Sequence, residues 1–146
     1  MSSSLVGVGQ VPGQAQGKGP GGNDTLPLID HRIYTIKLRK MPEFLEVFNR
    51  LALPILLETL GNPVGFYTSQ VGPLNQFVHL WAYQDMSDYE RRCNARDTHP
   101  GFPAYLSASE HLIEAQETRL IRAVEFSKSL QQNRRKQGAL HETNQR

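Results

Sequence analysis

The stretch of sequence that decides the fold is VGPLNQFVHLWAY, residues 71–83. It reads as a turn followed by a strand. Because side chains alternate between the two faces of a strand, this strand has two unlike faces. One face is aliphatic and carries Val78, Leu80 and Ala82. The other is bulky and aromatic with polar tips, and carries Phe77, His79, Trp81 and Tyr83. We expect the aliphatic face to pack against helices and the aromatic face to form a pocket or an interface.

The segments around this stretch predict the order β-α-β-β-α-β. Hydrophobic periodicity and turn residues divide the chain between the tails. The expected elements are a strand over 30–38, a helix from Pro42 to Gly61 that Pro54 kinks, strands over 64–71 and 76–83, a helix that begins at a capping box over 87–90 and is broken at 99–101, and a strand over 116–126.

This order is the α+β, ferredoxin-like arrangement with an antiparallel four-stranded sheet. Its two helices cover only one face of the sheet. The other face is expected to hold Tyr34, Phe66, Trp81 and Tyr83, which are too apolar to meet water. We therefore expect a homodimer whose sheets pack face to face, a dimeric α+β barrel, with a cavity between or beside them.

Composition separates this domain from its ends. Residues 1–29 are rich in Gly, Ser and Gln and predict a flexible tail, and residues 127–146 predict a polar, basic tail that is loose or a frayed helix. Residues 30–126 hold ten Lys/Arg and twelve Asp/Glu, a net charge of −2, so the overall charge of +2 comes from the C-terminal tail. The domain therefore lacks the positive face of a nucleic-acid binder.

The lone cysteine, Cys93, excludes an internal disulfide and a cysteine-based zinc site. It fits a reducing compartment, and its helix face, shared with Tyr89, predicts a buried, inert thiol. The sequence has no apolar run of about 18 residues and no secretory or transit pattern, so we expect a cytoplasmic protein without membrane insertion.

Residues Asp30 to Phe126 resemble the NIPSNAP family. The resemblance covers about two-thirds of the chain and rests on the runs RIYT (32–35), VGFYTS (64–69), GPLNQ (72–76) and VHLWAY (78–83). It implies the dimeric α+β barrel fold. Animal members are associated with mitochondria and their removal by autophagy, but they carry a targeting segment and two such domains, so that role is not transferred to this chain.

The resemblance implies less about activity, because single-domain members mostly have no defined function. The wider superfamily with this barrel includes cofactor-independent monooxygenases of aromatic substrates, small lactone isomerases and haem-degrading enzymes. Fold alone does not choose among them. No cofactor or metal is expected, since the sequence contains no phosphate loop, dinucleotide fingerprint or metal-ligand motif.

Arg32 is the first candidate for chemistry. It shares a strand face with Asp30 and Tyr34, and a cation on a buried face requires a partner, for which Asp30 or Glu117 is available. Two interpretations stay open. Arg32 forms an ion pair that fixes the dimer, or it anchors the carboxylate or oxyanion of a substrate.

His79 is the second candidate, because histidine can act as a general base near neutral pH. Tyr34, Phe66, Trp81 and Tyr83 would then form an aromatic wall for a planar ligand, with Glu117 and Arg119 as charged ligand-binding residues. The alternative is a hydrogen-bonded histidine in a packed interface. His99 fits a loop-capping role, and His111 matches no metal motif.

Two functions remain from the sequence. The first is a cytoplasmic homodimer with a small-molecule pocket, and, if it is an enzyme, one that oxygenates or isomerises a hydrophobic or aromatic compound without a cofactor. In that case His79, Arg32 and Tyr34 are the catalytic residues. The second is a non-catalytic ligand sensor or interaction module, in which the same residues form an interface.

Overall fold

The chain forms one antiparallel sheet with helices packed on one of its faces. The structure, a computed structural model, describes residues 26–143. Its strands are β1 (Leu28–Ile36), β2 (Gly65–Thr68), β3 (Gln76–Tyr83) and β4 (Ile113–Arg122). Its helices are α1 (Met41–Val47), α2 (Leu53–Thr59), α3 (Met86–Asp97), α4 (Phe102–Ser109) and α5 (Glu125–Thr143), with a turn of π-helix, η2 (Phe48–Ala52), between α1 and α2.

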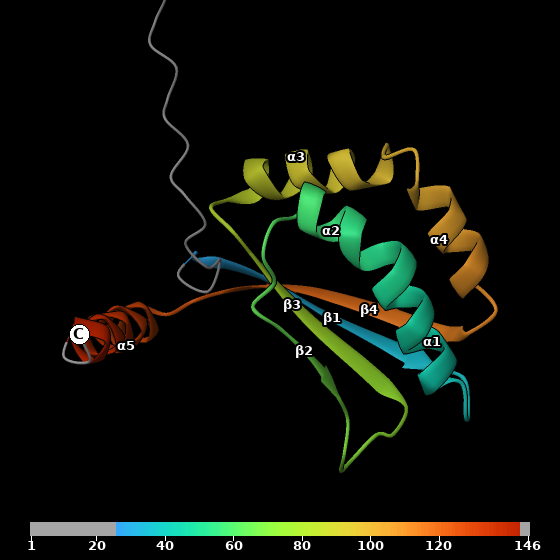
Figure 1. Cartoon of the computed structure of the whole chain (residues 1–146), viewed down its shortest axis with the longest axis horizontal. Coiled ribbons are helices and arrows are strands. Elements are labelled where there is room, and N and C mark those ends of the chain that lie inside the picture. Colours follow the sequence, from blue (N-terminus) through green and yellow to red (C-terminus); the bar gives the residue numbers. More distant parts are fainter. Residues whose placement is uncertain (1–25, 144–146) are drawn as a thin grey trace, which may run out of the picture.

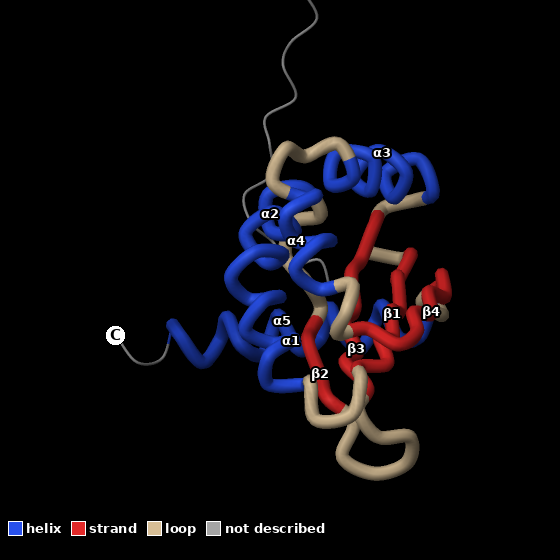
Figure 2. Tube along the Cα trace, turned by 90° about the vertical axis from the view of Figure 1, so that its right-hand side faces the viewer, coloured by secondary structure: helices blue, strands red, loops and turns tan. Residues whose placement is uncertain are grey.

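The strand order is β2-β3-β1-β4, and every neighbouring pair is antiparallel. Helices α1 to α4 lie on one side of this sheet (Figure 1). This is the predicted α+β, ferredoxin-like fold, with β1 and β3 in the centre. β4 lies at the outer edge (Figure 2), and every residue from Glu114 to Arg122 is exposed.

The helices cover the aromatic face of β3, so the expected assignment of its two faces is wrong. Phe77, His79, Trp81 and Tyr83 are all between 0 % and 2 % exposed. The ring of Phe77 lies 5.3 Å from that of Phe44 in α1 and 4.9 Å from that of Phe48 in η2. Val78 and Leu80 face the other way and remain partly exposed, although Ala82 is buried.

The physical reason is the amount of surface that each face can bury. Aromatic side chains bury far more area than Val or Ala, so covering them gives the larger hydrophobic gain. The helices supply matching aromatic residues, Phe44, Phe48 and Tyr105, which join Phe77 and Trp81 in one core cluster. The chain therefore covers its aromatic face without a second subunit.

The hairpin of β2 and β3 forms as predicted, with a shorter first strand and a longer loop. β2 ends at Thr68, and the loop that follows contains two residues in the left-handed region, Gly72 (φ 90°) and Asn75 (φ 59°). Glycine and asparagine tolerate this conformation best. Phe66 is paired with His79 and shares its helix-covered face, while Tyr67 faces the opposite way.

The first helical region shows the predicted interruption at Pro54 and ends before Gly61, which has a φ of 84°. Proline lacks the N–H that a regular helix needs. Here the interruption takes the form of η2, the wider π-helical turn that immediately precedes α2.

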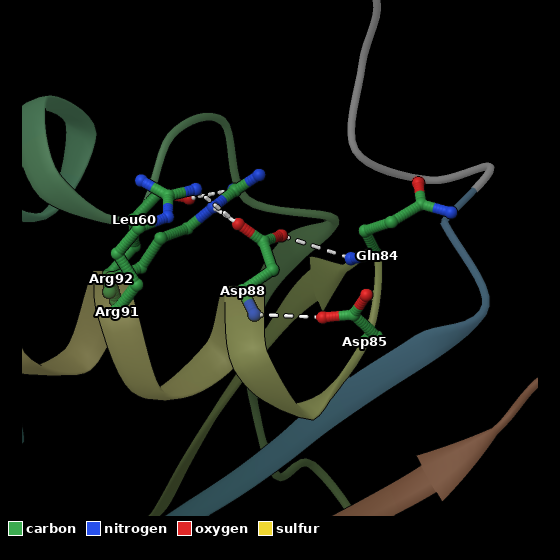
Figure 3. Close-up of polar contacts among 6 residues, drawn as sticks. All are labelled: Leu60, Gln84, Asp85, Asp88, Arg91 and Arg92. Carbon is green, nitrogen blue, oxygen red and sulfur yellow. Dashed lines mark hydrogen bonds and ion pairs between the residues drawn. The ribbon is translucent and has the colours of Figure 1, made fainter.

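The capping box of α3 involves residues other than those predicted. The N-cap is Asp85, whose carboxylate accepts a hydrogen bond from the backbone N–H of Asp88 at 2.9 Å. Asp88 in turn accepts one from the backbone N–H of Gln84 at 3.0 Å (Figure 3). Asp85 and Asp88 thus take the roles that the sequence predicted for Ser87 and Glu90, although Asp88 accepts from the residue before the N-cap. The helix therefore begins at Met86, one residue before the predicted cap.

The C-terminal segment forms α5, a helix of 19 residues, where the sequence predicted a loose tail or a frayed helix. It leaves the end of β4 and projects away from the sheet (Figure 1). The expected N-terminal tail, residues 1–29, lies outside the described residues except for its last four, of which Leu28 and Ile29 belong to β1 and not to a tail. Within residues 26–143, no helix combines the length and the apolar character needed to span a bilayer.

Candidate functional site

A cavity of about 560 Å³ lies between the sheet and the helices of one chain. This corrects the expected position, which was between or beside two sheets. The buried part of its wall comes from β1, η2, α2, β3 and α4, and its exposed rim from the end of α3, α4 and β4. Its apolar wall is formed by Phe48, Leu56, Leu60, Phe102, Leu106 and Ile113.

The cavity brings together the three residues predicted as catalytic: Arg32, Tyr34 and His79. β1 and β3 are paired so that Arg32 lies opposite His79 and Tyr34 lies opposite Phe77. Residues directly opposite each other share a face of the sheet, so all three side chains are on the helix side. The ring of Tyr34 contacts that of His79 edge-on, with centroids 4.8 Å apart.

Arg32 is held by Asp30, which settles the choice of its partner. The two side chains form a buried ion pair, with Arg32 Nε donating to Asp30 Oδ2 at 2.7 Å. Arg32 Nη2 lies 3.9 Å from the sulfur of Cys93, which is buried as predicted. Glu117 is paired with Ile33 and faces the opposite side of the sheet, so it cannot serve as the partner.

Burial raises the pKa of Asp30, whereas the pKa of Arg32 rises in spite of burial. Asp30 is fully buried, and its Oδ1 has no hydrogen-bond partner among residues 26–143. Loss of solvation therefore raises its pKa, against the opposing effect of Arg32. For Arg32, burial alone would lower the pKa, but the charge of Asp30 and the contact with Tyr34 outweigh it and raise the pKa. Arg32 thus stays charged.

The hydrogen bond from Trp81 fixes the protonation of His79. Trp81 Nε1 donates to His79 Nδ1 at 2.9 Å, so Nδ1 is an acceptor and carries no proton. In a neutral imidazole the proton then sits on Nε2. His79 Nε2 is buried without a partner in the described part of the chain.

The surroundings of His79 also keep it neutral. Burial, followed by the positive charges of Arg32 and Arg96, lowers its pKa to about 3. A general base needs a free lone pair, and the only one on this ring is occupied by the indole of Trp81. The geometry therefore argues against the predicted general-base role and makes His79 a hydrogen-bond donor at neutral pH.

Arg96, on α3, is a cavity residue that the sequence analysis missed. Its side chain is 12 % exposed, and its Nε donates to Asp97 at 2.8 Å. The guanidinium lies 5.6 Å from the centre of the Phe102 ring. Arg96 follows Cys93 by three residues, and helix residues at this spacing share a face. The predicted burial of Cys93 could therefore have indicated that Arg96 also faces the interior.

Tyr105 and Ser109, on α4, also line the cavity and were not predicted as site residues. The hydroxyl of Tyr105 is buried and has no hydrogen-bond partner of ordinary geometry among residues 26–143. Burial and the neighbouring Tyr34 raise its pKa, while Ser109 opposes the rise. Tyr105 is therefore a neutral phenol whose hydroxyl can donate a hydrogen bond to a ligand.

The residues predicted to bind substrate do not line the cavity. Trp81 donates a hydrogen bond to His79, which does line the cavity. Phe66 stacks on Phe77, with the ring centroids 5.9 Å apart, and neither ring lines the cavity. Tyr83 packs against Tyr89 in α3 at 5.1 Å. Glu117 and Arg119 are exposed on the opposite face of the sheet.

On that face Arg119 contacts His31, with Nη2 and Nδ1 3.0 Å apart. His99 caps the loop before α4 as predicted, accepting from the backbone N–H of Gly101 at 3.0 Å. No group of three or more His, Cys, Asp and Glu side chains suited to a metal occurs within residues 26–143.

Comparison with known proteins agrees with this fold and identifies the family. The NIPSNAP family model matches residues 29–128. The chain belongs to the NIPSNAP family. No curated protein matches it.

Solved NIPSNAP structures superpose on most of the domain. A NIPSNAP family protein with unknown function from Agrobacterium tumefaciens is 27 % identical, with a TM-score of 0.66 over 70 % of this chain and 92 % of its own. An uncharacterized NIPSNAP domain protein from Burkholderia xenovorans is 28 % identical, with a TM-score of 0.65 over 68 % of this chain and 96 % of its own.

A putative antibiotic biosynthesis monooxygenase from Nitrosomonas europaea is more distant, at 14 % identity and a TM-score of 0.50 over 66 % of this chain and 98 % of its own. At this identity the likeness is one of fold. It shows that the NIPSNAP domain shares its sheet and helix arrangement with a protein described as a monooxygenase.

Proposed function

We propose that this NIPSNAP protein is a homodimer in which each subunit binds a small hydrophobic or aromatic molecule. The observation that carries the proposal is the cavity itself. Its volume of about 560 Å³ lies within the usual range for ligand pockets, and its wall combines apolar side chains with a few buried polar groups. Such a wall can hold a planar body and orient one polar end.

The proposed dimer uses the face of the sheet that the helices leave open. Ile33, Val78 and Leu80 are only half-buried there, and none of α1 to α4 covers them. The same face carries Glu117 and Arg119, which have opposite charges and could pair across a two-fold axis. Sheets of this kind can pack face to face about 10 Å apart. The interface is therefore aliphatic, and not aromatic as first expected.

If the ligand is a substrate, the reaction class that we propose is cofactor-independent oxygenation or isomerisation. Arg32 would stabilise an oxyanion as it forms, and His79 would donate a hydrogen bond to the same oxygen. The alternative is a non-catalytic sensor, in which the cavity binds the molecule and leaves it unchanged. Mass spectrometry of a bound compound after aerobic incubation distinguishes the two, because only the enzyme yields a product.

Filling the cavity tests whether it binds ligands. Ser109 is buried in the cavity wall, whereas Ser107 on the same helix is exposed. A panel of aromatic acids, amides and quinols, including 1-naphthoate and 1-naphthamide, is titrated by calorimetry against wild type, Ser109→Phe and Ser107→Phe. We expect binding to wild type and Ser107→Phe and a loss of at least about tenfold in Ser109→Phe. Unchanged binding in Ser109→Phe, or no binding by any compound, would refute the proposal.

A further inference from the structure

The polar side chains of the cavity interior can all donate hydrogen bonds. Arg32 and Arg96 have only N–H groups, and His79 presents Nε2–H because Trp81 occupies Nδ1. The hydroxyl of Tyr105 is buried in the same wall and has no hydrogen-bond partner of ordinary geometry among residues 26–143. Arg32, Arg96 and His79 can therefore only donate to a ligand, and the hydroxyls of Tyr34, Tyr105 and Ser109 can donate or accept.

Each cavity arginine is paired with one carboxylate through its Nε, Arg32 with Asp30 and Arg96 with Asp97, which leaves the far end of the Arg96 guanidinium for a ligand. Asp30 is fully buried behind Arg32, and its Oδ2 is already occupied by that residue. Asp97 and Glu110 belong to the exposed rim, where the side chain of Asp97 is 55 % exposed. Solvent screens the exposed carboxylate of Asp97 more than the less exposed guanidinium of Arg96, so Arg96 keeps part of its positive charge for a ligand.

His79 supplies an independent observation that something should bind here. Its side chain is 2 % exposed, and its Nε2–H has no acceptor among the described residues. A buried donor that lacks an acceptor is unfavourable. The guanidinium groups of Arg32 and Arg96 line the same cavity as His79, so both positive charges are available to a ligand that binds there.

We propose that the cavity recognises an aromatic carboxylate. Its two oxygens accept hydrogen bonds from the guanidinium of Arg96 and from Nε2–H of His79, with Arg32 adding a second positive charge. The ring of the ligand packs against Phe48, Leu56 and Phe102. Arginine suits this role because its planar fork matches a carboxylate. The inference rests on the proposed pocket and adds the chemical class of its ligand.

The test compares 1-naphthoate with 1-naphthamide, which has the same shape but no charge. We expect calorimetry to show naphthoate binding wild type at least about tenfold more tightly than naphthamide. Arg96→Gln should abolish this preference while leaving the affinity for naphthamide within about twofold. Arg91→Gln is the matched control, because Arg91 lies on the same helix with a side chain that is 72 % exposed.

The outcomes separate this inference from the proposed function. Binding of neither compound would overturn the carboxylate inference, while the proposed function falls only if no compound of the whole panel binds. Equal binding of the two compounds would exclude recognition of a carboxylate but would still support a pocket for small molecules. A preference that survives in Arg96→Gln would overturn the role of Arg96. Arg96→Lys, which keeps the charge, should retain part of the preference and guards against a folding defect in the glutamine variant.

Discussion

A hydrogen bond from the indole of Trp81 to Nδ1 of His79 decides what the histidine can do. The two residues are two positions apart on one strand, so the sequence could show that they are neighbours on one face. It could not show which ring nitrogen the indole would contact, because that depends on the rotamers of both side chains. The contact converts a predicted base into a donor.

The depressed pKa of His79 predicts a loss of stability in acid. Its pKa falls from 6.5 to about 3 on folding, so between these pH values the unfolded chain binds one proton more than the folded one. Stability contributed by the neutral imidazole is present above pH 6.5 and is lost as the pH falls. Between pH 7 and pH 5 we expect this group alone to cost about 2 kcal/mol.

Urea unfolding of wild type and His79→Gln at pH 7 and pH 5 measures this effect. Glutamine can still accept a hydrogen bond from Trp81 but does not titrate. Other ionisable groups, including Asp30, affect both proteins alike. The difference in unfolding free energy between the two proteins should therefore shift by about 2 kcal/mol in favour of the variant at pH 5. Parallel pH profiles would show that His79 titrates normally in the folded protein.

At the scale of elements, α3 is important because it links the helical layer to the cavity. Its first turn is held by Asp85, which accepts from the backbone N–H of Asp88, and the carboxylate of Asp88 accepts from Arg92 Nε at 2.8 Å (Figure 3). Arg92 Nη1 donates to the carbonyl of Leu60 at the end of α2, also at 2.8 Å. The start of α3 is thereby tied to α2, while its last turn presents Arg96 to the cavity.

The cap of α3 gives a prediction with a matched control. Asp85→Ala removes the acceptor for the backbone N–H of Asp88 and should lower the free energy of unfolding by about 1 kcal/mol. Ser87→Ala, at the position that the sequence favoured, should change it by less than about 0.5 kcal/mol. Urea midpoints of the two variants decide between the caps. A larger loss in Ser87→Ala would mean that the helix begins there.

At the scale of the whole molecule, the open face of the sheet is the surface that helices α1 to α4 leave uncovered (Figure 1). The aromatic face is buried inside the chain, so the residues available for association are aliphatic ones such as Ile33, Val78 and Leu80. Their exposure in a single chain supports the homodimer that we propose. The β4 strand and its exposed Ile121 extend this surface to the edge.

Light scattering of Val78→Lys tests the dimer. A lysine at the centre of a sheet-to-sheet contact would bury an unpaired charge, so we expect this variant to be a monomer and wild type to be a dimer. Leu57→Lys is the control, because Leu57 is 44 % exposed on α2, on the helical side. It should remain a dimer. A monomeric wild type, or a dimeric and folded Val78→Lys, would exclude this interface.

The sequence by itself determined the order of the elements, the fold class and the family. These follow from local patterns: the alternation over residues 76–83, the breaks at Pro54 and His99–Gly101, and the turn that contains Gly72 and Asn75. It also placed Arg32, Tyr34 and His79 in one candidate site. Local patterns suffice for this because periodicity and turn chemistry act between residues that are close in the chain.

Only the tertiary structure decided which face of the sheet the helices cover, and with it the position of the cavity. A period of two separates the faces of a strand without saying which is covered, since that depends on the surface area buried against distant helices. The same packing brought Arg96 and Tyr105 to the cavity and sent Glu117 and Arg119 to the other side. Contacts between residues far apart in the chain therefore selected the site.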